Sequence, residues 1–296
     1  MKAFFVGATG FIGPHIVRAF LDAGFEVWVL LRSQGKGRFL PEGARFVEGD
    51  PRFPGKWQSI CSEADIVVNL AGESIFGLWT ASKRKRIRES RLASTRRVVE
   101  ALKSDAFLIN ASAVGYYGMD RGEELLTEES PPGEDFLAEV CVDWEREALR
   151  AKEKGCRVLV LRLGVVLGRG GALERMLWAY RVGLGAVVGS GRQWFPWVHI
   201  DDVVSAVFFA LDAGIDGPIN LVSPHPVRQK DFARSLASIL GRPCFLRIPA
   251  SVLKVILGEA SGLLLGSLRV VPKRLEEAGF SFKYAHLDAA LSSLLR

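Results

Sequence analysis

Three glycines near the start of the chain have the spacing of a phosphate-binding turn. The run Gly-Ala-Thr-Gly-Phe-Ile-Gly begins at Gly7, directly after the apolar stretch Ala3–Val6, and leads into Phe11–Ala23, which has helical periodicity. Gly7 allows a sharp turn off a strand, Gly10 lets a pyrophosphate approach the backbone, and Gly13 lets the helix pack closely on the sheet. Free N–H groups at the start of a helix attract phosphate oxygens. The run predicts a dinucleotide-binding turn with contacts from Gly7, Thr9, Gly10, Phe11, Ile12 and Gly13.

A basic residue follows the second predicted strand, Glu26–Leu31. In folds of this kind that bind NAD, an Asp or Glu at this point holds the ribose 2′-OH. Here Arg32 and Ser33 follow the strand, and no carboxylate stands at its end. Arginine binds phosphate through bidentate, charge-assisted hydrogen bonds. We therefore expect Arg32 and Ser33 to recognise a 2′-phosphate, which predicts NADP(H) rather than NAD. The alternative is a solvent-exposed basic loop.

Short apolar runs alternate with helical patterns through the first half of the chain. The predicted strands are Ala3–Val6, Glu26–Leu31, Ala44–Val47, Ile66–Leu70, Phe107–Asn110 and Arg157–Leu163. The predicted helices between them include Phe11–Ala23, Ser82–Lys103 and Phe136–Lys154. This order predicts an α/β fold, a Rossmann-type doubly wound parallel sheet, in which ligands bind at the carboxyl ends of the strands.

The pattern changes after about residue 170, where loops become rich in glycine and aromatic residues. Val203–Leu211 has the pattern of a helix, Gly217–Val222 that of a strand, and the remainder is mostly helical. We expect an NADP-binding Rossmann domain over residues 1–170, to which about 196–222 return. A smaller, mainly helical C-terminal lobe over residues 171–296 is expected to bind the substrate.

Composition excludes several classes of protein. The chain has 296 residues, 49% of them hydrophobic, and a net charge of +6 that suits anionic ligands. Its four cysteines form no disulfide framework, which is typical of a cytoplasmic protein, and its four histidines lack metal-ligand spacing. We expect a small-molecule substrate, no metal, no nucleic-acid partner and no membrane association. A monomer and a homodimer both remain open.

Two unusual segments have ordinary interpretations. Ser251–Val271 is the most apolar long segment, but Lys254, Glu259 and several glycines interrupt it. We expect a buried helix or a wall of the binding lobe there, not a membrane span. The basic run Lys83–Arg88 is interpreted as a solvated surface, because no aromatic residues interleave with it as in a nucleic-acid site.

Several motifs make the chain resemble the extended short-chain dehydrogenase/reductase superfamily. They are the glycine turn, Gly49-Asp50, Asn69-Leu-Ala-Gly72, Arg91-Leu-Ala-Ser-Thr95, Ser112-Ala-Val-Gly-Tyr-Tyr-Gly118 and Val198-His-Ile-Asp-Asp-Val203. More narrowly, the chain is similar to an atypical branch of the NAD-dependent epimerase/dehydratase family, the SDR39U1-like epimerase family proteins. The motifs of that branch are Ala71-Gly-Glu-Ser74, the tract Trp79–Ser94, Asp135-Phe-Leu-Ala-Glu-Val-Cys141, Gly189-Ser-Gly-Arg-Gln-Trp194 and Val271-Pro-Lys-Arg-Leu275. The resemblance implies NADP(H) binding, with further cofactor contacts from Asp50, Leu70, Ala71, Gly72 and Leu163, and a substrate contact from Glu73.

The superfamily's catalytic pair is absent from the matching helix. Its members use Tyr-x-x-x-Lys, in which the tyrosine moves a proton and the lysine holds the cofactor ribose and lowers the tyrosine pKa. Aligned through Glu145, the tyrosine position holds Leu137 and the lysine position holds Cys141. A leucine cannot exchange a proton, so the usual mechanism does not transfer. Cys141 has two interpretations, an inert core cysteine or a thiol that faces the cofactor or substrate.

Three other positions are candidates for chemistry. Ser112 resembles the superfamily serine that binds the substrate carbonyl, although the spacing to Tyr117 places that position at Ala113. Either Ser112 or the pair Tyr116 and Tyr117 would then present an oxygen near the nicotinamide; alternatively the tyrosines pack a loop. Arg91 replaces a superfamily asparagine on an inward helix face. It is expected to hold a substrate carboxylate or phosphate, or to pair with a structural Asp or Glu.

The segment Gly189–Trp197 has the composition of a pocket lip. Arg192 and Gln193 are expected to hydrogen-bond a polar ligand, and Trp194 and Trp197 to provide flat walls; a packed loop is the alternative. His199 is interpreted as structural, and Asp201 as the cap of the following helix.

Together these features predict an NADP(H)-binding protein with an atypical active site. We expect an oxidoreductase or epimerase that acts on a small polar carbonyl or sugar-like substrate without the Tyr-x-x-x-Lys pair. The alternative is a non-catalytic NADP(H) sensor or regulatory binding protein, which explains the missing pair directly.

Overall fold

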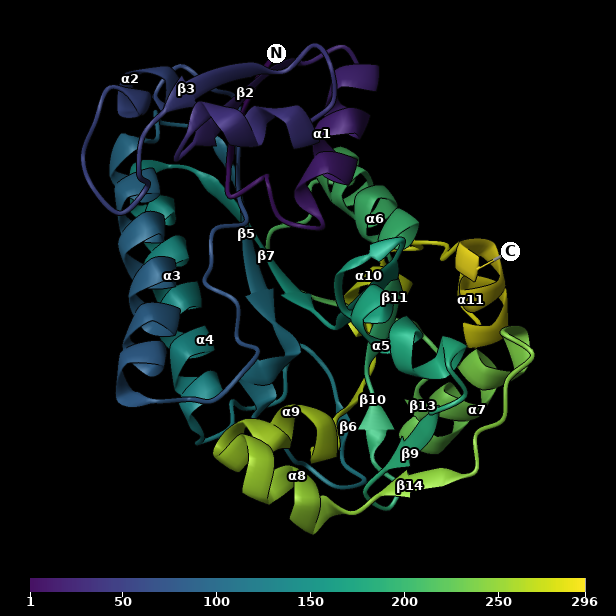
Figure 1. Ribbon diagram of the computed structural model, residues 1–296. Coiled ribbons are helices and arrows are strands. Elements are labelled where there is room, and N and C mark those ends of the chain that lie inside the picture. The colour runs from purple at the N-terminus through teal and green to yellow at the C-terminus, as the bar shows by residue number, and fades with distance from the viewer. Residues whose placement is uncertain (296) are drawn as a thin grey trace.

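A seven-stranded parallel sheet lies at the centre of the molecule (Figure 1). The computed structural model describes residues 1–295, apart from the side chains of Gln34 and Lys36. The strand order is β12-β7-β5-β4-β1-β2-β3, and every neighbouring pair is parallel. The strands are β1 (Lys2–Val6), β2 (Glu26–Leu31), β3 (Arg45–Glu48), β4 (Ile66–Asn69), β5 (Phe107–Ala113), β7 (Arg157–Leu163) and β12 (Gly217–Leu221).

Helices cover both faces of the sheet because its central strands are apolar on both sides. Alternate side chains of β1 enter different cores: Ala3 and Phe5 pack with the helices on one face, and Phe4 and Val6 with those on the other. The first face is covered by α1 (Gly13–Asp22) and α6 (Ile200–Asp212). The second is covered by α2 (Trp57–Cys61), α3 (Ala81–Ala101) and α4 (Phe136–Leu149). The predicted Rossmann-type fold class is therefore confirmed.

The direction of winding reverses between β1 and β4. From β1 the chain adds β2 and β3 on one side, whereas β4, β5, β7 and β12 extend the other side. In parallel sheets of this kind a ligand binds at the carboxyl edge, at the point where the strand order reverses. The strand β12 belongs to the second half of the chain and closes the far edge of the sheet.

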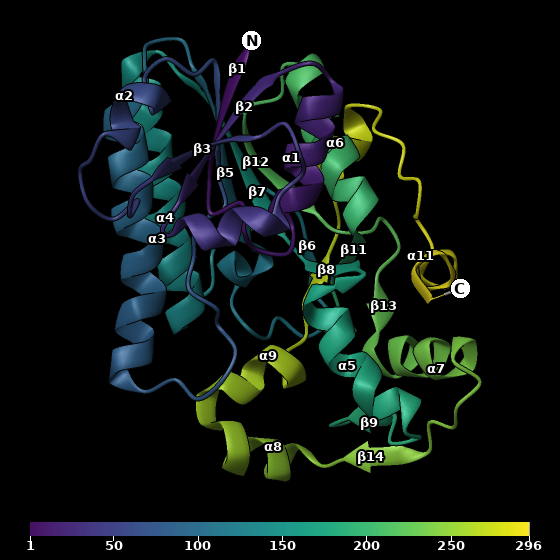
Figure 2. The ribbon, with the colours of Figure 1, turned by 45° about the horizontal axis from the view of Figure 1, so that its top comes forward.

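The second half of the chain builds a mainly helical region beside the sheet (Figure 2). Four two-stranded sheets connect its segments: β10 with β13, β11 with β8, β14 with β9, and β15 with β6. The short strands are β6 (Leu125–Leu126), β8 (Val165–Gly168), β9 (Ala186–Val188), β10 (Trp194–Phe195), β11 (Trp197–His199), β13 (Val227–Arg228), β14 (Leu246–Ile248) and β15 (Arg269–Val270). The helices are α5 (Gly171–Arg181), α7 (Gln229–Ile239), α8 (Ala250–Leu257), α9 (Gly262–Leu265), α10 (Lys273–Glu277) and α11 (Leu287–Leu295).

Short 3-10 helices and caps account for most differences from the predicted boundaries. The expected helix Phe136–Lys154 divides into α4 and the 3-10 helix η3 (Arg150–Lys154). The remaining 3-10 helices are η1 (Gln34–Phe39), η2 (Val114–Tyr117) and η4 (Gly258–Ser261). The expectation that Asp201 caps α6 was wrong: the cap is His199, whose Nδ1 accepts a hydrogen bond of 3.1 Å from the Asp201 backbone N–H.

The apolar segment 251–271 is not a buried helix. Within it α8 has no buried residue, and Val255 and Ile256 are 86% and 59% exposed. The segment packs through the next turns instead, where Ala260 and Leu263 contact α3 and α4. No helix in the described part of the chain is both long and apolar enough to span a membrane.

Candidate functional site

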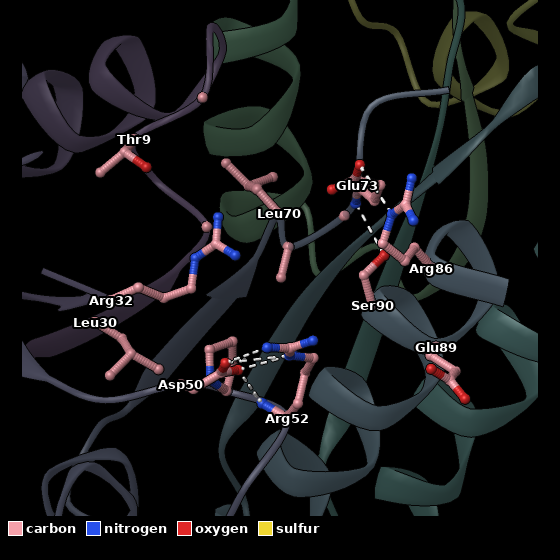
Figure 3. A pocket seen from close by; sticks show the side chains of 15 residues that line it. Thr9, Leu30, Arg32, Asp50, Arg52, Leu70, Glu73, Arg86, Glu89 and Ser90 are labelled. Atoms are coloured by element: carbon pink, nitrogen blue, oxygen red, sulfur yellow. Dashed lines mark hydrogen bonds and ion pairs between the residues drawn. The ribbon is translucent and has the colours of Figure 1, made fainter. Parts of the chain in front are cut away.

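A cavity of about 290 Å³ opens where the winding of the sheet reverses. Figure 3 shows Arg32 extending from the end of β2 into the space between Thr9 and Arg52. Nine residues predicted for the site line this cavity: Gly7, Thr9, Gly10, Arg32, Asp50, Leu70, Ala71, Gly72 and Glu73.

The glycine turn has the geometry that its sequence predicts, with one correction. Gly7 has φ +77°, and a Cβ there would lie 2.6 Å from the backbone nitrogen of Ala71. Gly10 is open, because a Cβ there would meet nothing closer than 3.6 Å. Gly13 serves the turn rather than helix-to-sheet packing, since its Cβ would lie 2.1 Å from the carbonyl oxygen of Ala8.

The start of α1 has no side-chain cap. Side chains cap α3, α4 and α6 through Thr80, Asp135 and His199, whereas the first N–H groups of α1 receive no side-chain cap. No acidic residue lies in the first turn of α1. Its positive end is therefore available to a phosphate beside Gly10.

Four other predicted cofactor residues have side chains outside this cavity. The ring of Phe11 lies against Gly168, Gly170 and Gly171, and Ile12 and Leu163 pack against the core cluster of that sheet face. Ser33 is exposed at the start of η1. The three apolar side chains are partly buried, because packing against the core removes part of their surface from water.

Charged residues surround the cavity in both signs. Arg32 has no carboxylate within 4 Å among the described residues, whereas Arg52 forms a bidentate pair with Asp50 at 2.6 to 3.1 Å. The hydrogen bond from Arg52 lowers the pKa of Asp50, and that from Lys83 lowers the pKa of Glu73. Both carboxylates are therefore ionised at neutral pH.

Sequence reasoning missed part of the cavity lining. Arg52, Arg86 and Ser90 line the cavity but were not predicted for it. Arg86 and Ser90 are four residues apart on α3 and so share one helix face, a spacing that was available in the sequence. The other missed lining residues are Leu30, Pro51 and Glu89.

Buried polar side chains hold the segment after β4. Asn69 donates to Thr95 Oγ1 at 2.9 Å and to Asn110 Oδ1 at 2.7 Å, and its own Oδ1 accepts from the Ala71 N–H. Trp144 Nε1 donates to the same Thr95 oxygen at 2.9 Å. These bonds tie β4, β5, α3 and α4 together and position the backbone of residues 70–72 at the cavity.

The helix α4 matches the superfamily helix that carries the catalytic tyrosine and lysine, but at those two positions it has apolar side chains. Leu137 and Cys141 are 7% and 5% exposed on α4. Burial, together with the nearby charge of Glu145, raises the pKa of the Cys141 thiol to about 12. The thiol is therefore neutral at physiological pH, which favours the interpretation as an inert cysteine.

Ser112 and Tyr117 belong to a buried hydrogen-bond network under the site. Ser112 Oγ donates to Glu145 Oε1 at 2.6 Å, and Arg162 binds the same carboxylate through two bonds of 3.0 and 2.9 Å. Tyr117 OH accepts from Arg162 Nη1 and donates to Asn220 Oδ1. Burial raises the pKa of Tyr117 to about 12. These contacts use both hydroxyls internally, so a catalytic role for Ser112 or Tyr117 has no support in this geometry.

Tyr116 is the tyrosine whose hydroxyl stays free. Its ring lies 3.4 Å from the guanidinium carbon of Arg162 and meets Tyr117 edge-on at 5.3 Å. It is partly exposed, and its O–H donates to no residue that the structure describes. Tyr116 can therefore present a hydroxyl to a ligand from a rigid position.

Arg91 reaches from α3 to the segment after β4. Its Nη1 donates to the carbonyl oxygens of Glu73 at 3.1 Å and Ile87 at 3.0 Å, and its guanidinium lies 5.1 Å from the ring of Trp144. The expectation of a structural Asp or Glu partner was wrong, because no described carboxylate lies within 4 Å of it.

The segment 189–197 is held by contacts with other parts of the protein. The Gln193 side chain donates to the carbonyls of Val188 and Leu264, so its amide hydrogens are used within the protein. Trp197 is 1% exposed and belongs to a core cluster, which corrects its assignment as a pocket wall. Trp194 donates to Glu123 and stacks under Arg228 at 3.6 Å.

Arg192 lines a second cavity of about 310 Å³ together with Glu123, Arg228 and Lys230. Arg228 is paired with Glu123 at 2.8 Å and also donates to the Arg192 carbonyl. Of the four predicted substrate residues, Glu73 lies at the first cavity and Arg192 at the second, whereas Trp194 begins β10 and Gln193 directly precedes it. The structure therefore does not bring them to one point.

His199 gives the protein a dependence of stability on pH. It is 2% exposed, and burial lowers its pKa below the ordinary value of 6.5. The unfolded chain therefore binds this proton more readily, and stability is lost as the pH falls through 6.5. His199→Asn keeps a capping oxygen and should reduce the loss of unfolding free energy between about pH 7.5 and 5.5, measured in urea. The exposed His225→Gln should leave that loss unchanged; an equal effect of both variants would contradict the assignment.

The model of the NAD dependent epimerase/dehydratase family matches residues 3–222 of this chain. Residues 248–294 match a domain of unknown function, DUF1731. The epimerase family protein SDR39U1 homolog of Arabidopsis thaliana, described as chloroplastic, is 38% identical over 98% of this chain and 85% of its own length. The epimerase family protein YfhF of Bacillus subtilis is 34% identical over 100% of this chain and 98% of its own.

A solved structure extends the similarity to the whole fold. The crystal structure of the human epimerase family protein SDR39U1, determined with NADPH, superposes with a TM-score of 0.86. The two chains are 30% identical, and the match covers 99% of each. This agreement includes the helical C-terminal region as well as the sheet.

Proposed function

Because the chain belongs to the NAD-dependent epimerase/dehydratase family, among its SDR39U1-like members, we propose that it binds NADP(H) at the first cavity and uses it in a reductase or epimerase reaction. The observation that carries this proposal is the open glycine turn beside Arg32, which has no carboxylate within 4 Å in residues 1–295 as described. Bound NADPH in the human relative supports the choice of the phosphorylated cofactor. When bound, the cofactor supplies a hydride acceptor or donor.

The residues of the cavity fit such a dinucleotide. Gly10 and the uncapped start of α1 suit the pyrophosphate, and Arg32 at the end of β2 suits the 2′-phosphate. Asp50 and Leu70 lie at the ends of the neighbouring strand segments, where they can border the adenine. The two additional guanidinium groups of Arg52 and Arg86 add positive potential at the same rim.

Arg32→Ala tests cofactor preference. We expect it to weaken NADPH binding by about 10- to 100-fold, since a charge-assisted contact contributes about 1.5–3 kcal/mol, and to change NADH binding little. Arg45→Ala removes an exposed arginine at the opposite end of the neighbouring strand β3 and serves as the matched control. Fluorescence titration of both nucleotides measures the change. Equal loss for NADPH and NADH would contradict recognition of the 2′-phosphate.

The chemistry beside the cofactor falls to few residues. Ala113, Leu137 and Cys141 occupy the positions of the superfamily serine, tyrosine and lysine, and none of them can exchange a proton at neutral pH. We propose that Tyr116 orients the oxygen of a small polar carbonyl or sugar-like substrate. Its fixed ring and free hydroxyl support this role.

Tyr116→Phe removes that one hydroxyl while keeping the ring under Arg162. With a substrate identified from a panel of carbonyl compounds and nucleotide sugars, we expect kcat/KM to fall roughly tenfold, the value of one hydrogen bond. NADPH affinity should not change. The measurement is the reduced-nicotinamide absorbance over time, and full activity of the variant would remove Tyr116 from the proposal.

The missing proton-transfer pair also supports a second function, that of an NADP(H) sensor or regulatory binding protein. A sensor would bind NADPH tightly but show no turnover with any member of the same panel. Measurable turnover that Arg32→Ala reduces would decide for the enzyme. We propose that the partner of this protein is a small molecule and not a nucleic acid. We also propose a cytoplasmic location, because all four cysteines are free.

A further inference from the structure

Arg91 differs from every other cation of its helix in having no counter-charge. Seven further Lys and Arg side chains of α3 each lie within 4 Å of a described carboxylate: Lys83, Arg84, Lys85, Arg86, Arg88, Arg96 and Arg97. Among the described residues Arg91 has none, although it is partly buried. Its charge is therefore balanced only by two carbonyl dipoles and the face of Trp144.

A guanidinium in this setting has unused binding capacity. Its two hydrogen bonds both leave from Nη1, and Nε and Nη2 donate to no residue that the structure describes. The sealed and unpartnered side-chain atoms of the described residues are Glu128 Oε2, Trp197 Nε1 and Arg269 Nε. The free N–H groups of Arg91 are not among them, so they are not fully sealed from solvent.

The position of Arg91 joins it to the cofactor cavity. Gly72 lines that cavity, and a Cβ on Gly72 would lie 3.1 Å from the guanidinium carbon of Arg91. The positive charge also acts on Cys141, where it opposes the rise in the thiol pKa caused by burial. Arg91 thus lies between the segment after β4, through Gly72 and Glu73, and the ring of Trp144 on α4.

We infer that the free edge of Arg91 is an oxyanion site that a bound ligand completes. A planar pair of N–H donors matches two oxygens of a phosphate or carboxylate, and burial makes an unpaired cation costly until such a group arrives. The oxyanion belongs either to the nicotinamide-side phosphate of the dinucleotide or to the substrate. This inference rests on the proposed function, because it places the ligand in the proposed cofactor site.

Comparing NADPH with 2′,5′-ADP, which has only the adenine half of NADPH, distinguishes the two sources of the oxyanion. NADPH and 2′,5′-ADP are titrated into the wild type, Arg91→Gln, Arg91→Lys and the control Arg96→Gln, which removes an exposed cation from the same helix. If the cofactor supplies the oxyanion, Arg91→Gln lowers the affinity for NADPH at least tenfold and changes the affinity for 2′,5′-ADP by less than twofold. Arg91→Lys keeps the positive charge but loses the paired N–H donors of the guanidinium. Its NADPH affinity is therefore expected to lie between those of the wild type and Arg91→Gln.

Inorganic phosphate probes the second source. It is titrated into NADPH-loaded protein, and the fluorescence of the bound nucleotide is followed. If the substrate supplies the oxyanion, the wild type and Arg96→Gln bind phosphate, Arg91→Gln loses that binding at least tenfold, and NADPH affinity stays unchanged.

Other results overturn the inference. Unchanged affinity for NADPH together with no phosphate binding that depends on Arg91 would leave the site without a ligand. Equal weakening of NADPH and 2′,5′-ADP with a lower melting temperature would make Arg91 a structural support of residues 71–74. If the wild type binds neither nucleotide, the proposed function fails, and phosphate titration of the ligand-free protein then tests Arg91 by itself.

Discussion

Glu145→Gln should lower the free energy of unfolding by about 3–5 kcal/mol. The side chains of Glu145 and Arg162 are 7% and 4% exposed, and two hydrogen bonds of 2.9 and 3.0 Å join them. Burial opposes the charge of Arg162, but the bonds to Glu145 outweigh it and raise the guanidinium pKa. A neutral amide keeps the shape of Glu145 and leaves a buried cation without its counter-charge, which is the costly outcome.

The effect should spread to the candidate site because the same pair supports its tyrosines. Arg162 donates to Tyr117 OH and stacks on the ring of Tyr116, so a displaced guanidinium also releases these two side chains. Urea unfolding measures the stability change. A double variant, Glu145→Gln with Arg162→Met, should recover part of the loss, because it removes the unpaired charge.

Arg146→Gln is the matched control on the next residue of α4. Its side chain is 69% exposed and pairs with Asp143 at 2.7 Å. Exposed pairs contribute about 0–1 kcal/mol, because water and salt screen them. A loss of less than about 1 kcal/mol in Glu145→Gln as well would show that the buried pair adds no more than the surface pair.

Gly7→Ala should weaken NADPH binding by about 100-fold, equal to about 3 kcal/mol. The residue has φ +77°, where an L side chain costs about 1–2 kcal/mol. Its new Cβ would also lie 2.6 Å from the Ala71 nitrogen and 2.7 Å from the carbonyl carbon of Leu70, both backbone atoms. The turn must therefore move away from the segment after β4, and the two walls of the proposed cofactor site separate.

Gly24→Ala isolates the contribution of backbone strain. Gly24 has φ +80°, close to that of Gly7, but a Cβ there would meet nothing within 4 Å. We expect this variant to lose about 1–2 kcal/mol of stability and to keep its NADPH affinity. Fluorescence titration and melting curves of both variants make the comparison. Wild-type affinity in Gly7→Ala would contradict the proposed position of the cofactor.

Local rules were sufficient for much of the fold and part of the site. The alternation of apolar runs and helical stretches placed β1, β2, β4, β7 and the principal helices of the first half, because side-chain periodicity reflects which face is buried. The glycine turn and Arg32 were equally local, since the turn begins directly after β1 and Arg32 directly after β2. Boundaries moved where a cap or a 3-10 turn competes with the helix, as at His199 and after Leu149.

The predictions that failed concern side chains whose partners lie far away in the chain. Ser112 and Tyr117 looked available in the sequence, but Glu145, Arg162 and Asn220 use their hydroxyls. The amide of Gln193 binds Leu264, and Trp197 is buried by helices of the second half. No local pattern reveals such partners. The two residues joined by each of these three hydrogen bonds lie between 33 and 103 positions apart in the chain.

The sequence by itself determined a Rossmann-type sheet, a glycine turn open to phosphate and a basic residue where the fold expects ribose recognition. Each of these depends on backbone conformation or periodicity, which neighbouring residues control. Only the tertiary structure decided which polar groups remain free. Among the described residues it left the Tyr116 hydroxyl and one edge of the Arg91 guanidinium without a hydrogen-bond partner, and it gathered Arg52 and Arg86 beside Arg32. The physical reason is that hydrogen bonds and charges are satisfied in space, between elements that the sheet brings together.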